Sequence, residues 1–311
     1  MDNICSEDFK HRFPNIKSIN EILSLDFPPQ EWLVSDLLPL GTAILAGPPK
    51  IGKSYFVLDL IAEILKKNHQ VFYYAGEDDF RRIKTRAIQL GIDGENLLVH
   101  AGREAPLVSK DATALDEIET MLDIRPTIKA VFIDTMQLIL PRTTKPRDYE
   151  TWVHDLRPWA ELSNNKSVAI LMVHHTRKEN NQADHNPYQS ILGSQGIIAS
   201  FDTVMIMSKS KDGKGATLNI TGKDVADSEY RLDKKDYGWK VSGLEAEVSL
   251  GKTQEIVLGY IRSNFAPYWK DIKKNLNIDG SYLSKILKTL IKKDILHETD
   301  GRYYLVIKEK K

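Results

Sequence analysis

Short apolar runs alternate with amphipathic segments along the chain from Gly41 to about Trp239. The runs have the length of buried strands, and the segments between them repeat their apolar positions with the period of a helix. The candidate strands are Thr42–Ala46, Val71–Gly76, Leu97–Ala101, Ala130–Asp134, Val168–Val173 and Thr203–Met207. The candidate helices are Lys53–Lys67, Phe80–Leu90, Ala112–Leu122 and Tyr149–Leu162. Strands and helices in alternation predict an α/β fold with a mostly parallel sheet.

The pattern changes near Ser249, where we place a domain boundary. Beyond it the periodicity predicts three helices and a hairpin. These are Thr253–Ser263, Trp269–Leu276, Ser281–Lys293 and two strands that turn at Asp300-Gly301. Three short helices and a hairpin are typical of a winged helix-turn-helix domain. The sequence therefore predicts an N-terminal arm over residues 1–40, an α/β domain over 41–248 and a small winged-helix domain over 249–311.

The third of these helices has one apolar face. Its buried stripe is predicted to consist of Leu283, Ile286, Leu287, Leu290 and Ile291. Its outward side near the N-terminus holds Ser281, Tyr282, Ser284, Lys285 and Lys288. In a helix-turn-helix this side faces a DNA groove, so Tyr282, Lys285 and Lys288 are candidate contacts. Winged helices also serve as protein docking modules, and the sequence leaves that alternative open.

Charge is balanced over the whole chain but not along it. The 311 residues include 43 lysines and arginines and 43 aspartates and glutamates, which gives a formal net charge of zero. Residues 252–311 carry 13 basic against 7 acidic side chains. The chain as a whole therefore has no basic field, whereas its C-terminal part is suited to a polyanionic partner.

The sequence predicts neither secretion nor a membrane. The only cysteine is Cys5, so no disulfide can form within one chain. Residues 1–14 are too polar for a signal peptide, and no apolar run approaches the roughly 20 residues that span a bilayer. We therefore expect a cytoplasmic protein without a membrane partner.

A phosphate-binding loop is the most specific motif of the chain. Its eight residues match the pattern G-x-x-x-x-G-K-S/T and lie between an apolar strand and an amphipathic helix. They are Gly47, Pro48, Pro49, Lys50, Ile51, Gly52, Lys53 and Ser54. Backbone N–H groups of such a loop surround the phosphates, while Lys53 reaches the β and γ oxygens and Ser54 holds Mg²⁺. The motif predicts a site for ATP and Mg²⁺ that extends to Tyr55, against the alternative of an ordinary strand-turn-helix.

Acidic residues follow two of the candidate strands. Asp134 comes after four apolar residues, and we expect it to hold Mg²⁺ through bound water. Glu77 follows the strand after the phosphate-binding loop, at the edge where a general base has to polarise the attacking water. Asp78 is the rival for that role. The alternatives are a helix-capping aspartate at position 134 and a solvated turn over residues 77–79.

Two histidines follow the strand Val168–Val173. A polar side chain at this sheet edge is able to sense the γ-phosphate by hydrogen bonding. Of the pair, we expect His174 rather than His175 in that role. A purely structural histidine at the end of a strand is the alternative.

The order of these features resembles the RecA-like ATPases of the hexameric replicative helicase group, a set of AAA-type P-loop ATPases, and in particular the RepA-like plasmid helicase branch. The lead-in Trp32–Gly41 and the later Gly193–Ile197 add to the resemblance, which covers residues 28–240. It implies a RecA-like P-loop NTPase core. It also implies a homo-oligomeric ring, usually a hexamer, with ATP between neighbouring subunits and single-stranded DNA in the channel.

In such rings a basic residue of the adjacent subunit completes the ATP site. The matching late strand offers Lys223, with Arg231 somewhat later, where the family usually has arginine. The resemblance thus implies Lys223 as a catalytic residue in trans, although lysine lacks the bidentate fork of arginine. DNA contacts are expected in the loops that leave the strand tips, against the alternative of ordinary solvated basic loops. The candidates there are Arg142, Lys145, Arg147 and Lys178.

Two classes of function follow from this pattern. The first is an ATP-dependent DNA helicase in DNA replication that hydrolyses ATP at the subunit interfaces of a ring. The second is a non-translocating ATP-dependent DNA-binding regulator or a recombination mediator. A small-molecule P-loop kinase fits less well, because such an enzyme has no use for the basic C-terminal part.

Overall fold

The computed structural model describes residues 11–306 with internal gaps. Outside the description lie residues 1–10, 14, 28, 106–112, 142, 177–187, 189–190, 192–193, 211–212, 245–251, 265, 293–294 and 307–311. The chain divides between Glu31 and Trp32 into two compact units. In the first unit, helix α2 (Ile19–Leu23) begins with a capping box between Ser18 and Glu21, and none of its residues is buried.

A short antiparallel pair, β1 (Trp32–Val34) and β2 (Leu38–Pro39), opens the second unit. Leu33 and Leu38 are fully buried in the core of that unit. The last residues of the predicted arm therefore pack with the α/β core.

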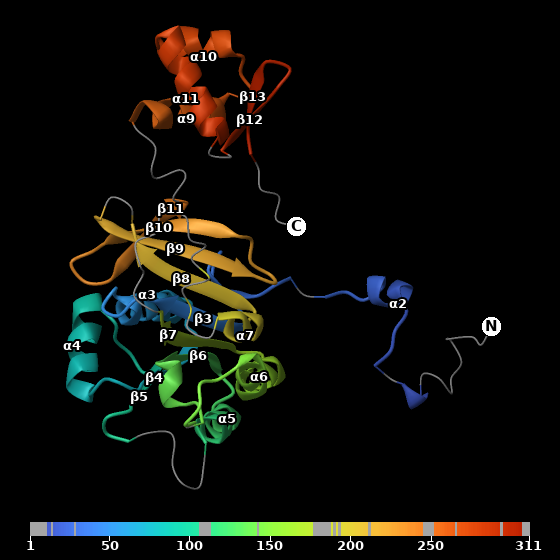
Figure 1. Ribbon diagram of the computed structural model, residues 1–311, viewed down its shortest axis with the longest axis vertical. Helices are drawn as coiled ribbons and strands as arrows, with labels where there is room; N and C mark the ends of the chain where they lie inside the picture. Colours follow the sequence, from blue (N-terminus) through green and yellow to red (C-terminus); the bar gives the residue numbers. More distant parts are fainter. Residues whose placement is uncertain are drawn as a thin grey trace. The chain divides into compact units, whose positions relative to one another are not determined.

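Within the described residues, nine strands form one mixed sheet at the centre of the second unit (Figure 1). In spatial order they are β11 (Trp239–Leu244), β10 (Ser228–Lys234), β9 (Gly215–Gly222), β8 (Thr203–Lys209), β3 (Gly41–Gly47), β7 (Ala169–His175), β6 (Ile128–Asp134), β4 (Gln70–Ala75) and β5 (Leu97–Ala101). The strands from β8 to β5 are parallel, and β9, β10 and β11 continue the sheet as an antiparallel meander. The predicted α/β fold with a mostly parallel sheet is confirmed.

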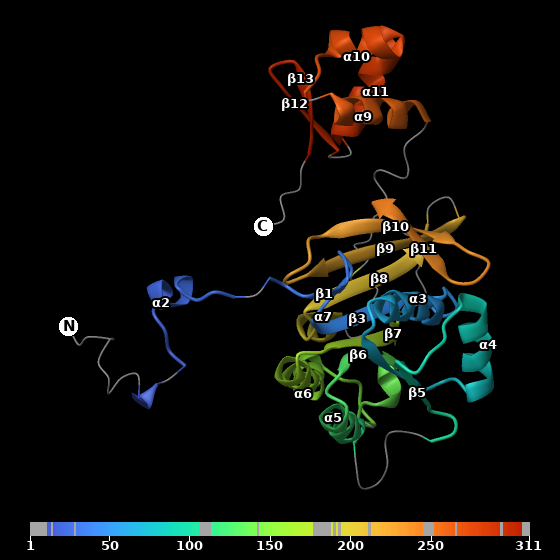
Figure 2. The ribbon, with the colours of Figure 1, turned by 180° about the vertical axis from the view of Figure 1, so that it is seen from behind.

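Helices cover both faces of this sheet (Figures 1 and 2). One face carries α3 (Lys53–Lys66) and α4 (Phe80–Leu90), and the other carries α5 (Ala114–Ile124), α6 (Tyr149–Lys166) and α7 (Ser194–Ala199). Strand residues divide between the two faces by parity, because successive side chains of a strand point to opposite sides. In β7, Leu171 and Val173 belong to the core under α3, whereas Ile170 and Met172 belong to the core under α6.

The apolar pattern of the sequence predicts neither β10 nor β11. Of the seven residues of β10, only Leu232 is buried. These strands lie at and beside the edge of the sheet, where much of the strand surface stays in solvent and no continuous apolar run is needed.

The residues from Lys252 onward have an apolar core of their own. Their elements are α9 (Lys252–Ser263), α10 (Trp269–Leu276), α11 (Gly280–Lys292), β12 (Leu296–Thr299) and β13 (Arg302–Leu305). At the turn of the hairpin, Asp300 and Gly301 have φ angles of 53° and 74°, the left-handed values that a tight hairpin turn requires. The assignment of these elements to a winged helix stays a prediction.

The apolar stripe of α11 is narrower than predicted. Leu283, Ile286, Leu287 and Leu290 are buried, whereas Ile291 is 37% exposed because it lies at the border of the stripe. Ser284, expected to face outward, is half-buried and accepts a hydrogen bond from the indole of Trp269 at 3.2 Å. Among the described helices, none is both long and apolar enough to cross a lipid bilayer.

Candidate nucleotide site

The phosphate-binding loop joins the end of β3, a central strand, to the first turn of α3. Gly47 is closely packed, since a Cβ there would lie 2.6 Å from the carbonyl oxygen of Met207. Gly52 has a φ of 105°, which residues with a side chain rarely adopt, and it offers α3 no side-chain cap. The first N–H groups of the helix thus lack the acceptor that a capping side chain would supply. This arrangement fits the binding of phosphate oxygens.

Lys53 is buried, with only 5% of its surface exposed. Its Nζ donates hydrogen bonds to the carbonyl oxygens of Gly47 at 2.7 Å and Pro48 at 3.0 Å, and lies 3.1 Å from Nδ1 of His175. Burial lowers the pKa of Lys53 to about 8, although the charges of Asp134 and Glu77 oppose the shift. The ammonium group is held by neutral acceptors, so its charge is available to a phosphate.

The lowered pKa of Lys53 predicts that ATP binding weakens at alkaline pH. Below about pH 8 the side chain is already charged, and binding needs no additional proton. Above that pH, binding has to protonate a neutral amine, so the affinity is expected to fall by up to about tenfold per pH unit. The Kd for Mg-ATP, measured at constant ionic strength between about pH 7 and pH 9.5, checks this expectation. A constant affinity over that range would contradict it.

Ser54 and Asp134 meet beside Lys53. The Ser54 hydroxyl hydrogen-bonds to Asp134, and this interaction opposes the rise in the Asp134 pKa that burial causes. The aspartate lies at the end of β6 and is only 7% exposed. A hydroxyl and a carboxylate are oxygen ligands of the kind that Mg²⁺ prefers, and a cation beside Asp134 would compensate for its burial. The chemistry of this pair therefore fits a magnesium ion.

Glu77 and Asp78, the two candidates for the general base, have different surroundings. The Glu77 side chain is 58% exposed, and its Oε1 lies 3.5 Å from the Thr135 hydroxyl and 4.0 Å from Nε2 of His175. The Asp78 side chain is 8% exposed and forms ion pairs with two arginines of α4. Both oxygens of the buried Asp78 carboxylate accept hydrogen bonds from guanidinium groups, so neither is free to receive a proton from an attacking water. The surroundings of the two carboxylates favour Glu77 as the general base.

The two histidines at the end of β7 lie on opposite faces of the sheet. His174 is only 2% exposed, with Nδ1 at 2.7 Å from the amide nitrogen of Gln137 and its ring against Trp152 of α6. His175 lies on the α3 face beside Lys53, and burial together with the lysine charge lowers its pKa. The expectation for His174 is corrected on this point, because strand parity directs His175 to the phosphate-binding loop.

Tyr55, which the sequence places at the end of the nucleotide-binding group, lies in the contact between α3 and α4. Its hydroxyl donates to Oε1 of Gln89 at 2.9 Å, and its ring lies 5.4 Å from the guanidinium carbon of Arg86. Arg86 also pairs with Asp78. This arginine therefore links the P-loop helix to the acidic loop that carries Glu77.

Lys223, the residue expected to act in trans, lies away from the phosphate-binding loop of its own chain. Lys223 follows β9 and pairs with Asp202 at 2.7 Å, and Asp202 in turn accepts a hydrogen bond from the Thr42 hydroxyl. Thr42 is near the start of β3, whereas the phosphate-binding loop follows the end of β3. Lys223 therefore lies at the end of the strand opposite to the loop. Arg231 of β10 is only 11% exposed and pairs with Asp233 at 3.1 Å. Lys223, 69% exposed, is the more accessible of the two.

The basic residues expected to contact DNA in the loops differ in exposure. Lys145 is exposed, whereas Arg147 is 14% exposed and pairs with Asp155 of α6 at 2.8 Å. Its guanidinium also lies 5.1 Å from the ring centre of Trp152. The candidacy of Arg147 is corrected on this ground, since a shielded, ion-paired guanidinium has little charge left for a phosphate. Outside the described residues lie Arg142 and Lys178.

The three candidate DNA contacts on α11 are accessible. Tyr282 is 50% exposed, and Lys285 and Lys288 are also exposed. On α10, Lys270 and Lys274 are exposed as well. Both helices therefore present lysines to solvent.

Comparison with known families identifies the domain that carries this site. Residues 10–181, more than half of the chain, match the family described as AAA domain. The chain belongs to the AAA domain family. Two curated relatives are similar to this AAA-domain chain, and both are named DNA repair protein RadA.

The similarity to these relatives is partial. The protein of Listeria monocytogenes is 26% identical over 182 residues, which cover 58% of the chain and 35% of the relative. The protein of Rickettsia bellii is 31% identical over 150 residues, which cover 46% of the chain and 30% of the relative. The AAA-domain chain thus spans about a third of the length of these two curated relatives.

A solved structure described as a DnaB-like replicative helicase and its interactions with primase is also similar. It matches with a TM-score of 0.52 at 14% identity, covering 71% of this chain and 65% of that one. The AAA-domain chain therefore shares the fold of that helicase structure, and its AAA domain confirms the predicted P-loop ATPase. The narrower RepA-like branch stays a prediction.

Proposed function

We propose that this AAA-domain protein is an ATP-driven DNA helicase of DNA replication that works as a ring of subunits. One observation carries the proposal: a single edge of the sheet brings together Lys53, Ser54, Asp134 and Glu77. This set supplies a phosphate-binding cation, two metal ligands and a base. Those are the functions that P-loop ATP hydrolysis requires.

Each of the four side chains has a separate task in hydrolysis. Lys53 offsets charge on the β and γ phosphates, while Ser54 and Asp134 would hold Mg²⁺. When bound, Mg²⁺ supplies the positive charge that stabilises the phosphates as the terminal bond breaks. Glu77 takes the proton of the attacking water, which its exposure allows to approach. His175, between Lys53 and Glu77, is the side chain placed to sense the terminal phosphate.

DNA as the partner is supported by the charge distribution. The basic excess of residues 252–311 and the exposed Tyr282, Lys285 and Lys288 suit the groove contact of a winged helix with DNA. Lys145 is the described loop candidate for contact with single-stranded DNA. The names of the similar proteins, DNA repair protein RadA and DnaB-like replicative helicase, point to DNA metabolism as well.

Assembly into a hexameric ring is supported by the place of Lys223. An exposed lysine at the edge of the sheet opposite its own phosphate-binding loop is suited to the site of a neighbouring subunit. It would stabilise the charge that develops on the phosphates in the transition state. Its present partner, Asp202, would then be exchanged for phosphate on assembly.

A second function is favoured by the names of the curated relatives. A DNA-repair or recombination mediator needs the same ATP site and a DNA-binding surface, but it does not displace strands. Both functions predict nucleotide-dependent contact with DNA. Unwinding of a forked duplex separates them.

The decisive experiment combines three measurements on the full chain. We expect ATP hydrolysis to rise with single-stranded DNA, the mass in solution to correspond to a ring in the presence of nucleotide, and a forked duplex to be unwound. DNA-stimulated hydrolysis without unwinding would establish the mediator. A monomeric protein whose rate of ATP hydrolysis does not change with DNA would rule out both functions.

A further inference from the structure

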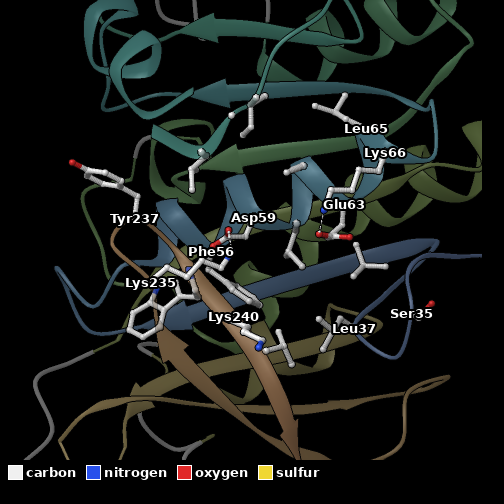
Figure 3. A pocket seen from close by; sticks show the side chains of 18 of the residues that line it. Ser35, Leu37, Phe56, Asp59, Glu63, Leu65, Lys66, Lys235, Tyr237 and Lys240 are labelled. Atoms are coloured by element: carbon white, nitrogen blue, oxygen red, sulfur yellow. Dashed lines mark hydrogen bonds and ion pairs between the residues drawn. The ribbon is translucent and has the colours of Figure 1, made fainter. Parts of the chain in front are cut away.

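The hairpin between β10 and β11 contacts α3, the helix that follows the phosphate-binding loop. The residues in this contact are not among those proposed to bind the nucleotide. The two elements form parts of the wall of a cleft of about 820 Å³. Figure 3 shows Asp59 and Lys235 joined across this wall, close to Phe56. Asp59 comes from α3, five residues after Ser54, the last residue of the phosphate-binding loop, and Lys235 follows β10.

Trp239, the first residue of β11, makes two directed contacts with this region. Its indole N–H donates to the carbonyl oxygen of Gly52 at 3.1 Å. Its backbone N–H donates to Oδ2 of Asp59 at 2.6 Å. The side chain is 9% exposed and belongs to the core under α3. One residue therefore fixes both the last glycine of the phosphate-binding loop and the helix that follows.

Two glycines make these contacts possible. A Cβ on Gly52 would lie 2.8 Å from the indole nitrogen of Trp239, and a Cβ on Gly238 would lie 2.6 Å from the Asp59 carboxylate. Both glycines have positive φ angles, 105° and 82°. Any side chain at either position would push the hairpin away from α3, so the close approach depends on both.

Asp59 anchors the hairpin from the other side. Burial raises its pKa, and the hydrogen bonds from Lys235 and from the Trp239 backbone oppose that shift. Its Oδ1 accepts from Nζ of Lys235 at 2.9 Å, while Oδ2 accepts from Trp239. Both carboxylate oxygens are thus used by the hairpin, and a partly buried charge is compensated by contacts from a single turn.

The Gly52 carbonyl is the acceptor that controls the start of α3. It also accepts the first helical hydrogen bond, from the Phe56 N–H at 3.0 Å. The next two residues, Lys53 and Ser54, carry the side chains for phosphate and metal. A tilt of the Gly52 peptide would move both, so a second donor on its carbonyl restrains their direction.

We propose that Trp239 is a positioning residue of the ATPase: through its indole N–H it holds the Gly52 peptide, and with Asp59 it keeps Lys53 and Ser54 aimed at the phosphates. This role rests on the nucleotide site described above. It predicts that the hairpin contributes to nucleotide affinity without touching the nucleotide. The expected effect is on Kd and KM for ATP, with a smaller effect on kcat.

The test compares Trp239→Phe, which keeps an aromatic ring but removes the donor, with Trp159→Phe. Trp159 is another buried tryptophan, 4% exposed, in the core on the opposite face of the sheet. We expect Trp239→Phe to raise the Kd for Mg-ATP by about 3- to 10-fold, the effect of one lost hydrogen bond to a carbonyl. Trp159→Phe is expected to leave the Kd within about twofold of the original protein. Equal Kd values for the two variants overturn the proposal.

A second pair of variants serves if Trp239→Phe does not fold. Asp59→Ala removes the anchor of the hairpin, and Glu63→Ala removes a carboxylate one turn later on the same helix, where it pairs only with the exposed Lys66 among the described residues. We expect Asp59→Ala to weaken ATP binding and Glu63→Ala to leave it unchanged. Equal binding by this pair overturns the proposal as well. Loss of hydrolysis in Lys53→Ala, measured alongside, shows that the nucleotide site itself is correctly placed even then.

Discussion

Replacing Glu77 by glutamine is expected to lower kcat for ATP hydrolysis by about 100- to 10,000-fold, the usual contribution of a general base. Glutamine keeps the size of the side chain and its contact with Thr135, but it cannot accept the proton of water. Glu77 touches neither Lys53 nor Ser54 through a hydrogen bond among those described, so Mg-ATP is expected to bind with nearly unchanged Kd. The measurements are steady-state hydrolysis and calorimetric binding of Mg-ATP.

The neighbouring acids provide the controls for this experiment. Asp79 caps α4 through the Arg82 N–H, and asparagine caps helices equally well, so Asp79→Asn is expected to hydrolyse ATP at the original rate. Asp78→Asn breaks a paired, buried carboxylate, so its main effect should be on the free energy of unfolding. Full activity of Glu77→Gln, with loss in a stably folded Asp78→Asn, would transfer the role of base to Asp78.

The histidine pair illustrates how far the sequence can determine a site. The strand and the two histidines are evident from the sequence, and alternation along the strand places them on opposite faces. The sequence alone does not say which face carries α3. Val173 packs under α3, and His175, two positions later in the strand, points to the same face by parity.

Contacts between distant segments were beyond the reach of sequence reasoning. Gly52 and Trp239 are separated by 187 positions, and β11 itself lacks the apolar run that predicts a strand. Arg147 presents a related difficulty. A basic residue in a loop predicts a DNA contact, and the sequence does not show that Asp155 pairs with it. The parallel strands were predictable because they are buried on both faces and leave continuous apolar runs.

Substituting Lys53 by alanine is expected to reduce ATP hydrolysis by at least about 100-fold and to weaken ATP binding. Among the described residues, no other cation hydrogen-bonds to the Gly47 carbonyl, so none is placed to replace the lysine at the phosphates. The free energy of unfolding, by contrast, should not fall in this variant near neutral pH. A fall of the pKa from 10.5 to about 8 means that folding disfavours the charged lysine by roughly 3 kcal/mol.

This cost is fully present below about pH 8 and is lost as the pH rises towards 10.5, so near neutral pH the alanine variant should unfold no more easily than the original protein. The check is thermal unfolding with and without Mg-ATP. The original protein should be stabilised by the nucleotide, because a ligand that binds only the folded state raises the unfolding free energy, whereas Lys53→Ala should show little response. A variant that hydrolyses ATP at the original rate would refute the assignment of the site. Destabilisation without nucleotide would instead mean that Lys53 holds the loop together, and that its bonds to Gly47 and Pro48 outweigh the burial of its charge.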